Sequence, residues 1–292
     1  MFFSNKSSIP VKHFGIRDGI KLLSDVGFPR VDLSMSDHTE EIKNDTWKDI
    51  AIEYKRAAEE NGIKYNQAHA PFGGGPLYVA EKAPLMPKAL EFAATAGVET
   101  LVIHPLYFYD LDGNEHKEDI TFERNMEFFS SLTPIARDLG VKIAIENLWT
   151  TNKQTKKIVG LVCADPESHK KYVTSLGAND VFTACLDVGH TAITGGQPQD
   201  SIRALGKDIL GALHIHDVNY VADLHTLPYL SRLDWDEICK ALGEIDYTGV
   251  MTFEADAFLR GMPREIIPDA IRFMASVGKH LADKVDSYRN NS

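Results

Sequence analysis

The feature that most constrains the fold of this chain is a repeated alternation of short, β-rich apolar runs with longer stretches of helical periodicity. Strands are expected at 1–4, 30–34, 63–69, 100–104, 141–146, 181–187, 209–215 and 250–254. This alternation is typical of βαβ units that build a parallel sheet. Eight such units predict an α/β protein with a single closed (β/α)₈ barrel, the TIM-barrel architecture.

Between these strands the periodicity predicts helices at 45–61, 77–96, 122–139, 166–176, 198–205 and 235–242, with a last helix and an extension at 263–288. Several helices are followed by a glycine, as helix C-termini prefer. These glycines are Gly62, Gly97, Gly140 and Gly177. No Pro- or Ser-rich linker or charge block divides the chain, so we expect residues 1–292 to form one domain.

Composition excludes several classes of protein. The 292 residues carry 31 Lys and Arg against 42 Asp and Glu, for a net charge of -11, which argues against affinity for nucleic acid. The three cysteines, Cys163, Cys185 and Cys239, form no CxxC motif, as expected in a reducing compartment. No leader or long apolar run is evident. We therefore expect a cytoplasmic protein without a membrane span, and a homo-oligomer is compatible with the sequence.

The predicted strand ends carry imidazoles and carboxylates. In a (β/α)₈ barrel the C-terminal strand ends surround the active site. The residues at or just after these ends are His69, His104, Glu146, Asp187, His190, His214 and Glu254. Such side chains are the usual N and O ligands of divalent metal ions. The sequence therefore predicts a metal site at this rim.

Each of these residues also has a simpler interpretation. A single histidine at a strand end is more often an ordinary hydrogen-bonded residue, and Glu146 or Asp187 could cap the following helix. Six strand ends in succession are harder to attribute to coincidence. Carboxylates crowded at one rim would also repel each other, so they need a cation or shared protons to coexist.

The motifs at these strand ends, AHAP, HP, AIEN, LDVGH, LHIHD and TFEAD, together with LDWDEICKALGEIDYTG, resemble those of the xylose-isomerase-like barrel superfamily. This superfamily contains sugar and sugar-phosphate isomerases and epimerases, and endonuclease IV. The resemblance to ketose 3-epimerases implies that Glu146, Asp187, His214 and Glu254 hold one divalent ion, Zn, Mn, Mg or Co. His214 is preferred to His216 because the family pattern His-x-x-Asp/Glu falls on His214 and Asp217.

A second resemblance is to endonuclease IV, in which nine ligands hold three zinc ions. It implies further sites at His69 and His104 with a bridging Glu146, and at His190, Asp223 and His225. The Asp-x-His pair at 223–225 also occurs in predicted sugar isomerases, so it does not choose between the classes. More than one ion can therefore be expected.

Two opposed carboxylates favour proton transfer at a carbon next to a carbonyl. Glu146 and Glu254 are the expected acid and base of a metal-dependent sugar or sugar-phosphate isomerase or epimerase that works through a metal-stabilised enediolate. The alternative is an endonuclease IV-like multi-zinc phosphodiesterase acting on DNA. Its basic surface would have to come from TTNKQTKK at 150–157, which is better explained as a solvated loop edge. A binding barrel without catalysis is the third class.

Substrate contacts are expected from His190 and from aromatic residues that follow strands. These residues are Phe72, Tyr107, Phe108, Trp149 and Tyr229, and each could equally pack in the core. The known ketose 3-epimerases carry a substrate-contacting Arg shortly after the metal-binding His, whereas the segment DVNYVADLH has none. The sugar therefore stays unassigned.

Overall fold

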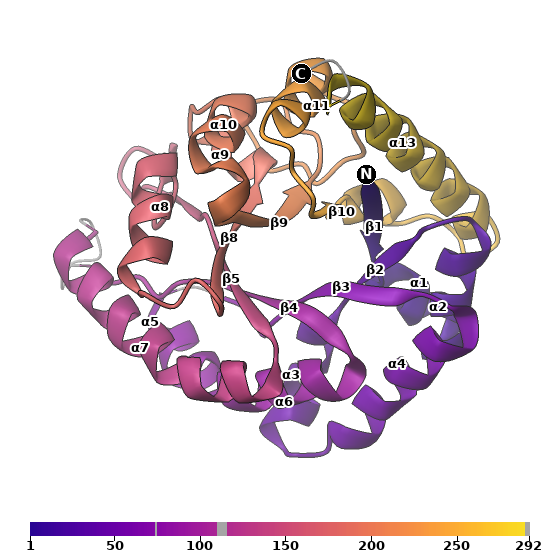
Figure 1. Ribbon diagram of the computed structural model, residues 1–292, viewed down its shortest axis with the longest axis horizontal. Coiled ribbons are helices and arrows are strands. Elements are labelled where there is room, and N and C mark those ends of the chain that lie inside the picture. Colours follow the sequence, from indigo (N-terminus) through magenta and orange to yellow (C-terminus); the bar gives the residue numbers. More distant parts are fainter. Residues whose placement is uncertain (74, 110–115, 290–292) are drawn as a thin grey trace.

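Eight parallel strands close into a barrel in the computed structural model, which describes residues 1–73, 75–109 and 116–289 (Figure 1). The strands are β1 (Phe2–Lys6), β2 (Arg30–Leu33), β3 (Lys64–His69), β4 (Val98–Ile103), β5 (Lys142–Glu146), β8 (Phe182–Asp187), β9 (Leu210–Ile215) and β10 (Val250–Phe253). Around the barrel they follow chain order, and β1 pairs with both β2 and β10. The predicted (β/α)₈ barrel is confirmed.

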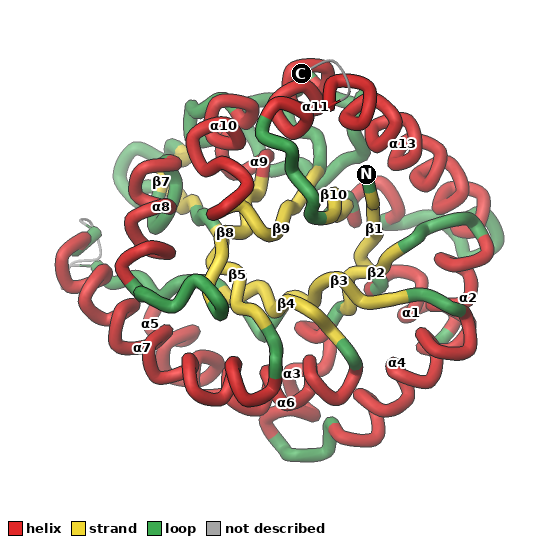
Figure 2. Tube along the Cα trace, in the orientation of Figure 1, coloured by secondary structure: helices red, strands yellow, loops and turns green. Residues whose placement is uncertain are grey.

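Helices surround this barrel on the outside (Figure 2). They are α1 (Ser8–Phe14), α2 (Ile16–Asp25), α3 (Thr39–Lys43), α4 (Lys48–Asn61), α5 (Gly75–Leu77), α6 (Met86–Ala96), α7 (Glu118–Leu139), α8 (Pro166–Ser175), α9 (Val188–Ile193), α10 (Pro198–Ile209), α11 (Trp235–Glu244), α12 (Asp256–Leu259) and α13 (Ile267–Arg289). The glycines after α4, α6 and α7 have positive φ, the left-handed conformation that ends a helix. None of the helices in the described residues combines the length and apolar character needed to cross a bilayer.

One predicted helix, 77–96, is broken in the structure. A π-helical turn at Tyr78–Lys82 and a 3₁₀ turn at Ala83–Leu85 precede α6, which begins only at Met86. Pro84 and Pro87 explain the interruption, because proline lacks an amide hydrogen and its ring clashes with the preceding helical turn. The structure also contains elements that were not predicted. They are the helices α1, α2, α3, α9 and α12, and a hairpin of β6 (Trp149–Thr151) and β7 (Ile158–Gly160). The exposed Lys153, Lys156 and Lys157 lie between these two strands.

The interior of the barrel sets the position of the site. Val102, Ala144, Cys185 and Ala212 form a small buried cluster of their own. Side chains alternate between the two faces of a strand, so the residue two positions further along points to the same interior. Those residues are His104, Glu146, Asp187 and His214. The strand period therefore carries these four side chains to the mouth of the barrel, above a floor of small residues.

The first strand, β1, extends further than predicted at its C-terminal end, which lies at the mouth of the barrel. It runs to Lys6 rather than to residue 4, because Asn5 pairs with Phe253 and Lys6 pairs with Asp32 on the neighbouring strands. Ser4 Oγ lies 3.0 Å from Thr252 Oγ1 and is buried. Ser4 therefore faces the barrel interior, and Lys6 points to the same mouth as the predicted site residues.

Candidate metal centre and active site

Four predicted ligands form one buried group at the mouth of the barrel. Glu146 ends β5, Asp187 ends β8, His214 lies in β9, and Glu254 follows β10. One ligand atom from each of the four lies within 4.8 Å of the others, and all four residues are buried. This donor set of three carboxylates and one imidazole suits a divalent ion such as Zn²⁺ or Mn²⁺.

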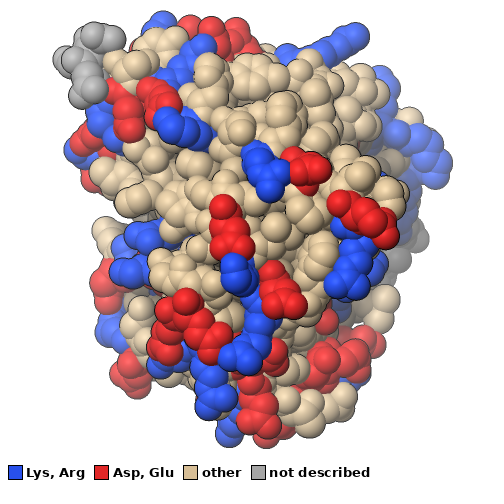
Figure 3. Space-filling view, turned by 90° about the vertical axis from the view of Figure 1, so that its right-hand side faces the viewer, with Lys and Arg blue, Asp and Glu red and all other residues tan. Residues whose placement is uncertain are grey.

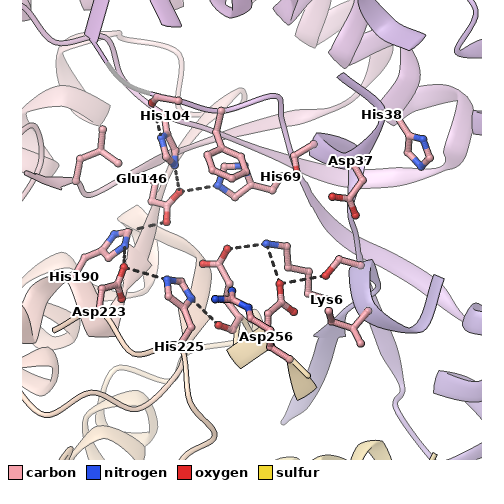
Figure 4. Close-up of a pocket in the computed structure, with 18 of the residues that line it drawn as sticks. Lys6, Asp37, His38, His69, His104, Glu146, His190, Asp223, His225 and Asp256 are labelled. Carbon is pink, nitrogen blue, oxygen red and sulfur yellow. Dashed lines mark hydrogen bonds and ion pairs between the residues drawn. The ribbon is translucent and has the colours of Figure 1, made fainter. Parts of the chain in front are cut away.

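Imidazoles flank the two oxygens of Glu146, and Figure 4 shows those of His69 and His104. Glu146 Oε1 is 2.9 Å from His214 Nδ1, whereas its Oε2 is 3.1 Å from both His69 Nε2 and His104 Nε2. Each oxygen thus faces a different group of candidate ligands. The carboxylate is placed to belong to two ion sites, one with His214 and one with His69 and His104.

Asp187 has two roles. Its Oδ1 accepts a hydrogen bond of 2.7 Å from the backbone N–H of His190 and so caps α9. Both carboxylate oxygens also lie near His216 Nε2, at 3.0 and 3.1 Å. Asp187 therefore caps a helix and is at the same time a member of the buried group of candidate ligands.

The His216 side chain reaches this position because Gly189 leaves room for it. A Cβ atom at Gly189 would lie 2.1 Å from the His216 ring, so a larger residue does not fit there. The ring stacks on His225 at 4.2 Å, with 6° between the planes. His216 thus supports Asp187 and His225, while His214 is the histidine that faces Glu146 and Glu254.

A third group of candidate ligands lies beside the first two. His225 Nε2 is 3.0 Å and His190 Nε2 is 3.5 Å from Asp223 Oδ2, and Trp149 Nε1 donates to the same oxygen at 3.3 Å. The other oxygen, Asp223 Oδ1, is buried without a hydrogen-bond partner among the described residues. Buried polar atoms are nearly always satisfied, so this oxygen fits an additional ligand such as a metal ion.

The orientation of four histidine rings also fits metal binding. The Nδ1 atoms lie near backbone carbonyls: His69 at 2.9 Å from Ala70 O, His104 at 3.3 Å from Gly73 O, His190 at 2.8 Å from Asn147 O and His225 at 2.8 Å from Glu254 O. An Nδ1–H that donates to a carbonyl turns Nε2 toward the carboxylates, where it can give up its proton and bind an ion. This arrangement fixes the ring and its tautomer in metal sites.

The electrostatics of the cluster call for positive charge. Burial would raise the pKa of Glu146, but the charge of His214 and hydrogen bonds from His104, His214 and His69 hold it well below its usual range. Burial would lower the pKa of His190, yet Asp187 and Asp223 raise it to about 10. Protons thus balance the carboxylates when no ion is bound, and a divalent ion would replace them.

Lys6 is a member of the site that the sequence analysis missed. Its Nζ lies 3.0 Å from Glu254 Oε1 and 3.5 Å from Asp256 Oδ2. Burial would raise the pKa of Glu254, but His214 and then Lys6 hold it well below its usual range. The sequence does contain a pattern that points to Lys6, because Phe2, Ser4 and Lys6 alternate along the strand and so share one of its faces. Its polar neighbour Asn5 made the predicted strand end too early.

A cavity of about 980 Å³ opens above these groups. His190, Phe72, Tyr107 and Trp149, the predicted substrate contacts, all line it. Phe108 does not line this cavity and packs instead near Tyr78. Tyr229 lies elsewhere, against α13, with its ring 5.8 Å from that of His280.

Comparison with known proteins places the chain in a family. The chain is 25% identical over 269 residues to an uncharacterized protein of Sinorhizobium fredii, with 82% of this chain and 81% of the relative covered. It is 29% identical over 133 residues to the D-psicose 3-epimerase of Agrobacterium fabrum, but that match covers only 46% of this chain and 41% of the epimerase. Among solved structures, the IolI protein with a bound zinc atom superposes with a TM-score of 0.72 at 17% identity, over 99% of both chains. The model of the xylose isomerase-like TIM barrels matches residues 20–277, and the chain therefore belongs to that family.

Proposed function

We propose that this protein is a metal-dependent isomerase or epimerase of sugars or sugar phosphates. One observation carries the proposal: Glu146 and Glu254 approach the same atom, His214 Nδ1, at 2.9 and 3.1 Å in a buried group below a cavity. Two carboxylates on either side of one ion position can serve as base and acid on a substrate held there. The likeness to a D-psicose 3-epimerase supports the same class of reaction.

The proposed ion ligands are Glu146, Asp187, His214 and Glu254, with further sites at His69 and His104 and at His190, Asp223 and His225. A bound Zn²⁺, Mn²⁺, Mg²⁺ or Co²⁺ ion would polarise the substrate oxygens and stabilise the charge of an enediolate. The IolI structure with its bound zinc supports such an ion in this fold.

The protein groups then move the proton. One glutamate takes the proton from the carbon next to the carbonyl, and the bonding pair becomes the C=C bond of the enediolate. The other glutamate enters the step protonated and gives its proton to the opposite face of that carbon or to the neighbouring carbon, while the electron pair on oxygen re-forms the carbonyl. Glu146 on β5 and Glu254 after β10 come from separate parts of the rim, as such a mechanism requires. His190, Phe72, Tyr107 and Trp149 would contact the sugar.

The alternative is a multi-zinc phosphodiesterase that acts on DNA. The two additional groups of candidate ligands favour it, because clustered ions activate water and neutralise a leaving group. The charge disfavours it, because the chain carries a net charge of -11. On the side face seen in Figure 3, Lys and Arg are interspersed with Asp and Glu rather than gathered into a basic patch. Affinity for a duplex depends on neutralising phosphates with such a patch.

One experiment separates these functions. Protein purified without chelator is analysed for bound metal and incubated in D₂O with a panel of sugars and sugar phosphates. We expect a bound divalent ion and solvent deuterium at a carbon next to the carbonyl of one sugar. Hydrolysis of abasic-site DNA, with binding that weakens steeply as salt rises, would instead support the nuclease. Absence of exchange on every sugar would contradict our proposal.

A further inference from the structure

Lys6 brings a buried cation into the cavity on the side of Glu254. Its side chain is only 10% exposed, yet it lines the cavity. Lysine is seldom buried this deeply unless its charge is paired. Here it is paired, because Lys6 Nζ contacts Glu254 and Asp256, and Ser8 Oγ donates to Asp256 at 3.1 Å. The cation is therefore fixed rather than free to turn toward solvent (Figure 4).

This cation makes the two glutamates unequal. Glu254 presents Oε2 to His214 and Oε1 to Lys6. Both oxygens of Glu146, by contrast, face imidazoles. An ion at the four-residue site would thus leave Glu254 with one oxygen on the ion side and one on the Lys6 side. Proton transfer at Glu254 would take place next to an ammonium group.

The ammonium group also has donor capacity to spare. A lysine carries three N–H donors, and its described contacts are with two carboxylates. Both carboxylates stand at or next to the cavity, since Glu254 and Asp256 line it with Lys6. A substrate oxygen beside Glu254 would therefore come within reach of the remaining donor.

We propose that Lys6 is a catalytic residue that donates a hydrogen bond to the substrate oxygen that becomes negatively charged. This role rests on the proposed isomerase or epimerase function. When Glu254 accepts the proton, the C–H bond breaks, its electron pair forms the C=C bond, and the carbonyl π pair moves to oxygen. Negative charge leaves Glu254 and appears on the substrate, while Lys6 remains protonated beside both. A preorganised donor of this kind stabilises the charge that develops in the transition state.

The proposed proton transfer defines which substrate oxygen Lys6 would serve. It is the carbonyl oxygen next to the carbon that gives its proton to Glu254. Lys6 would then complement an ion held by the four-residue group, because His214 faces Glu254 Oε2 whereas Lys6 faces Glu254 Oε1.

The test compares Lys6→Met, which removes the charge and keeps most of the stem, with Lys64→Met, which removes an exposed lysine at the start of β3, outside the cavity. For each variant we measure deuterium incorporation from D₂O into every sugar of the panel described above, D-psicose included, together with steady-state kcat and KM, bound metal and thermal unfolding. We expect Lys6→Met to lower kcat by roughly 10²-fold or more, the range for loss of one oxyanion donor, with unchanged metal content. Lys64→Met should stay within about threefold of the wild type.

A second variant guards against a folding defect. In Lys6→Ala the cavity left by the side chain admits a small cation, so ethylammonium should restore part of kcat, whereas a structural loss would not be restored. If wild-type protein exchanges deuterium and Lys6→Met does so at an equal rate, Lys6 has no catalytic role. Failure of ethylammonium to restore any activity to a folded, metal-loaded Lys6→Ala would also overturn it. Absence of exchange in the wild type on every sugar tested would overturn the proposed function itself.

Discussion

At the scale of single residues, the site is organised by which atom of each side chain faces which neighbour. Glu146 divides its two oxygens between two sets of imidazoles, and Glu254 divides its own between His214 and Lys6. These contacts place negative charge at fixed points where a cation is required. Substitutions that keep the shape and change only the charge therefore give the most direct tests.

Asp187→Asn should lower metal occupancy and activity together. Asparagine caps a helix about as well as aspartate, so α9 should persist while one negative ligand is lost. We expect ion affinity to fall by at least about tenfold, since even outer-shell changes cost 10–100-fold. Metal analysis of the purified variant checks this, with Asp180→Asn, an exposed partner of Arg137, as the control. Full occupancy with unchanged activity would remove Asp187 from the ligand set.

Glu254→Gln and Glu146→Gln should each slow proton transfer by roughly 10²-fold or more at saturating metal, the range for loss of a general acid or base. The two variants should lose exchange at the step that each glutamate serves, so their patterns of deuterium incorporation should differ. Saturating metal is required because each glutamate is also a proposed ligand. If both variants turn over the true substrate at nearly the wild-type rate, the carboxylates serve only to hold the ion.

At the scale of elements, close contacts between helices and strands hold the rim in place. α13 crosses β1 and β10 at Gly278, where a Cβ atom would lie 2.4 Å from Phe3 Cδ2 and 2.9 Å from Phe253 Cε2. α8 is joined to β5 by His169, whose Nε2 lies 2.7 Å from Ile145 O. The strands joined in this way include those that end in Lys6 and Glu146.

Gly278→Ala should destabilise the protein despite the better helix propensity of alanine. The propensity gain is at most about 1 kcal/mol, whereas overpacking a core costs about 1–3 kcal/mol. We expect a net loss of about 1–2 kcal/mol in the free energy of unfolding, measured by urea denaturation. Ser276→Ala, at an exposed position of the same helix, serves as the control. An increase in stability would mean that the two phenylalanine rings yield easily.

His169 should make stability depend on pH. Burial lowers its pKa from 6.5 to about 4, so the folded protein keeps this ring neutral while the unfolded chain takes up a proton below pH 6.5. The contribution of the neutral ring to the free energy of unfolding is complete above pH 6.5 and is lost as the pH falls toward 4. The loss between pH 7 and pH 5 is about 2 kcal/mol. The free energy of unfolding of His169→Gln should therefore fall less between pH 7 and pH 5 than that of the wild type. An equal loss in both proteins would exclude this effect, and His280→Gln, at an exposed site, should behave as wild type.

At the scale of the whole molecule, the barrel gathers four overlapping groups of candidate ligands around one mouth in the described residues, and Glu146 belongs to two of them. The number of ions bound therefore bears on the mechanism. An ion held by Glu146 with His69 and His104 would engage the carboxylate oxygen that the central ion leaves free. Both oxygens of Glu146 would then be occupied by ions, and Glu146 could no longer act as a base.

Excess zinc should therefore bind beyond one ion and slow sugar exchange. We expect native mass spectrometry to find one ion after dialysis and more than one at high zinc, with a rise in the unfolding temperature because the ions bind only the folded state. His104→Gln should weaken the additional binding and relieve the inhibition. A constant count of one ion at every zinc concentration would rule out the multi-ion sites.

The sequence alone determined the barrel and most of its rim. A closed parallel barrel brings every strand's carboxyl end to one mouth, and alternation fixes which residues face inward. Residues such as Glu146 and Asp187 could therefore be placed by their position at strand ends. Lys6 was missed because a polar neighbour shortened the predicted strand, and only its pairing with Asp32 on β2 extends it.

Tertiary structure alone decided the partners. Glu146 contacts His214, which lies 68 residues away, and Lys6 contacts Glu254, which lies 248 residues away. Asp223 and His225 lie on a loop, where no strand period applies, and their place beside His190 depends on backbone contacts such as His225 Nδ1 with Glu254 O. Local periodicity fixes the direction of a side chain, but the distance between two side chains depends on how separate strands and loops pack.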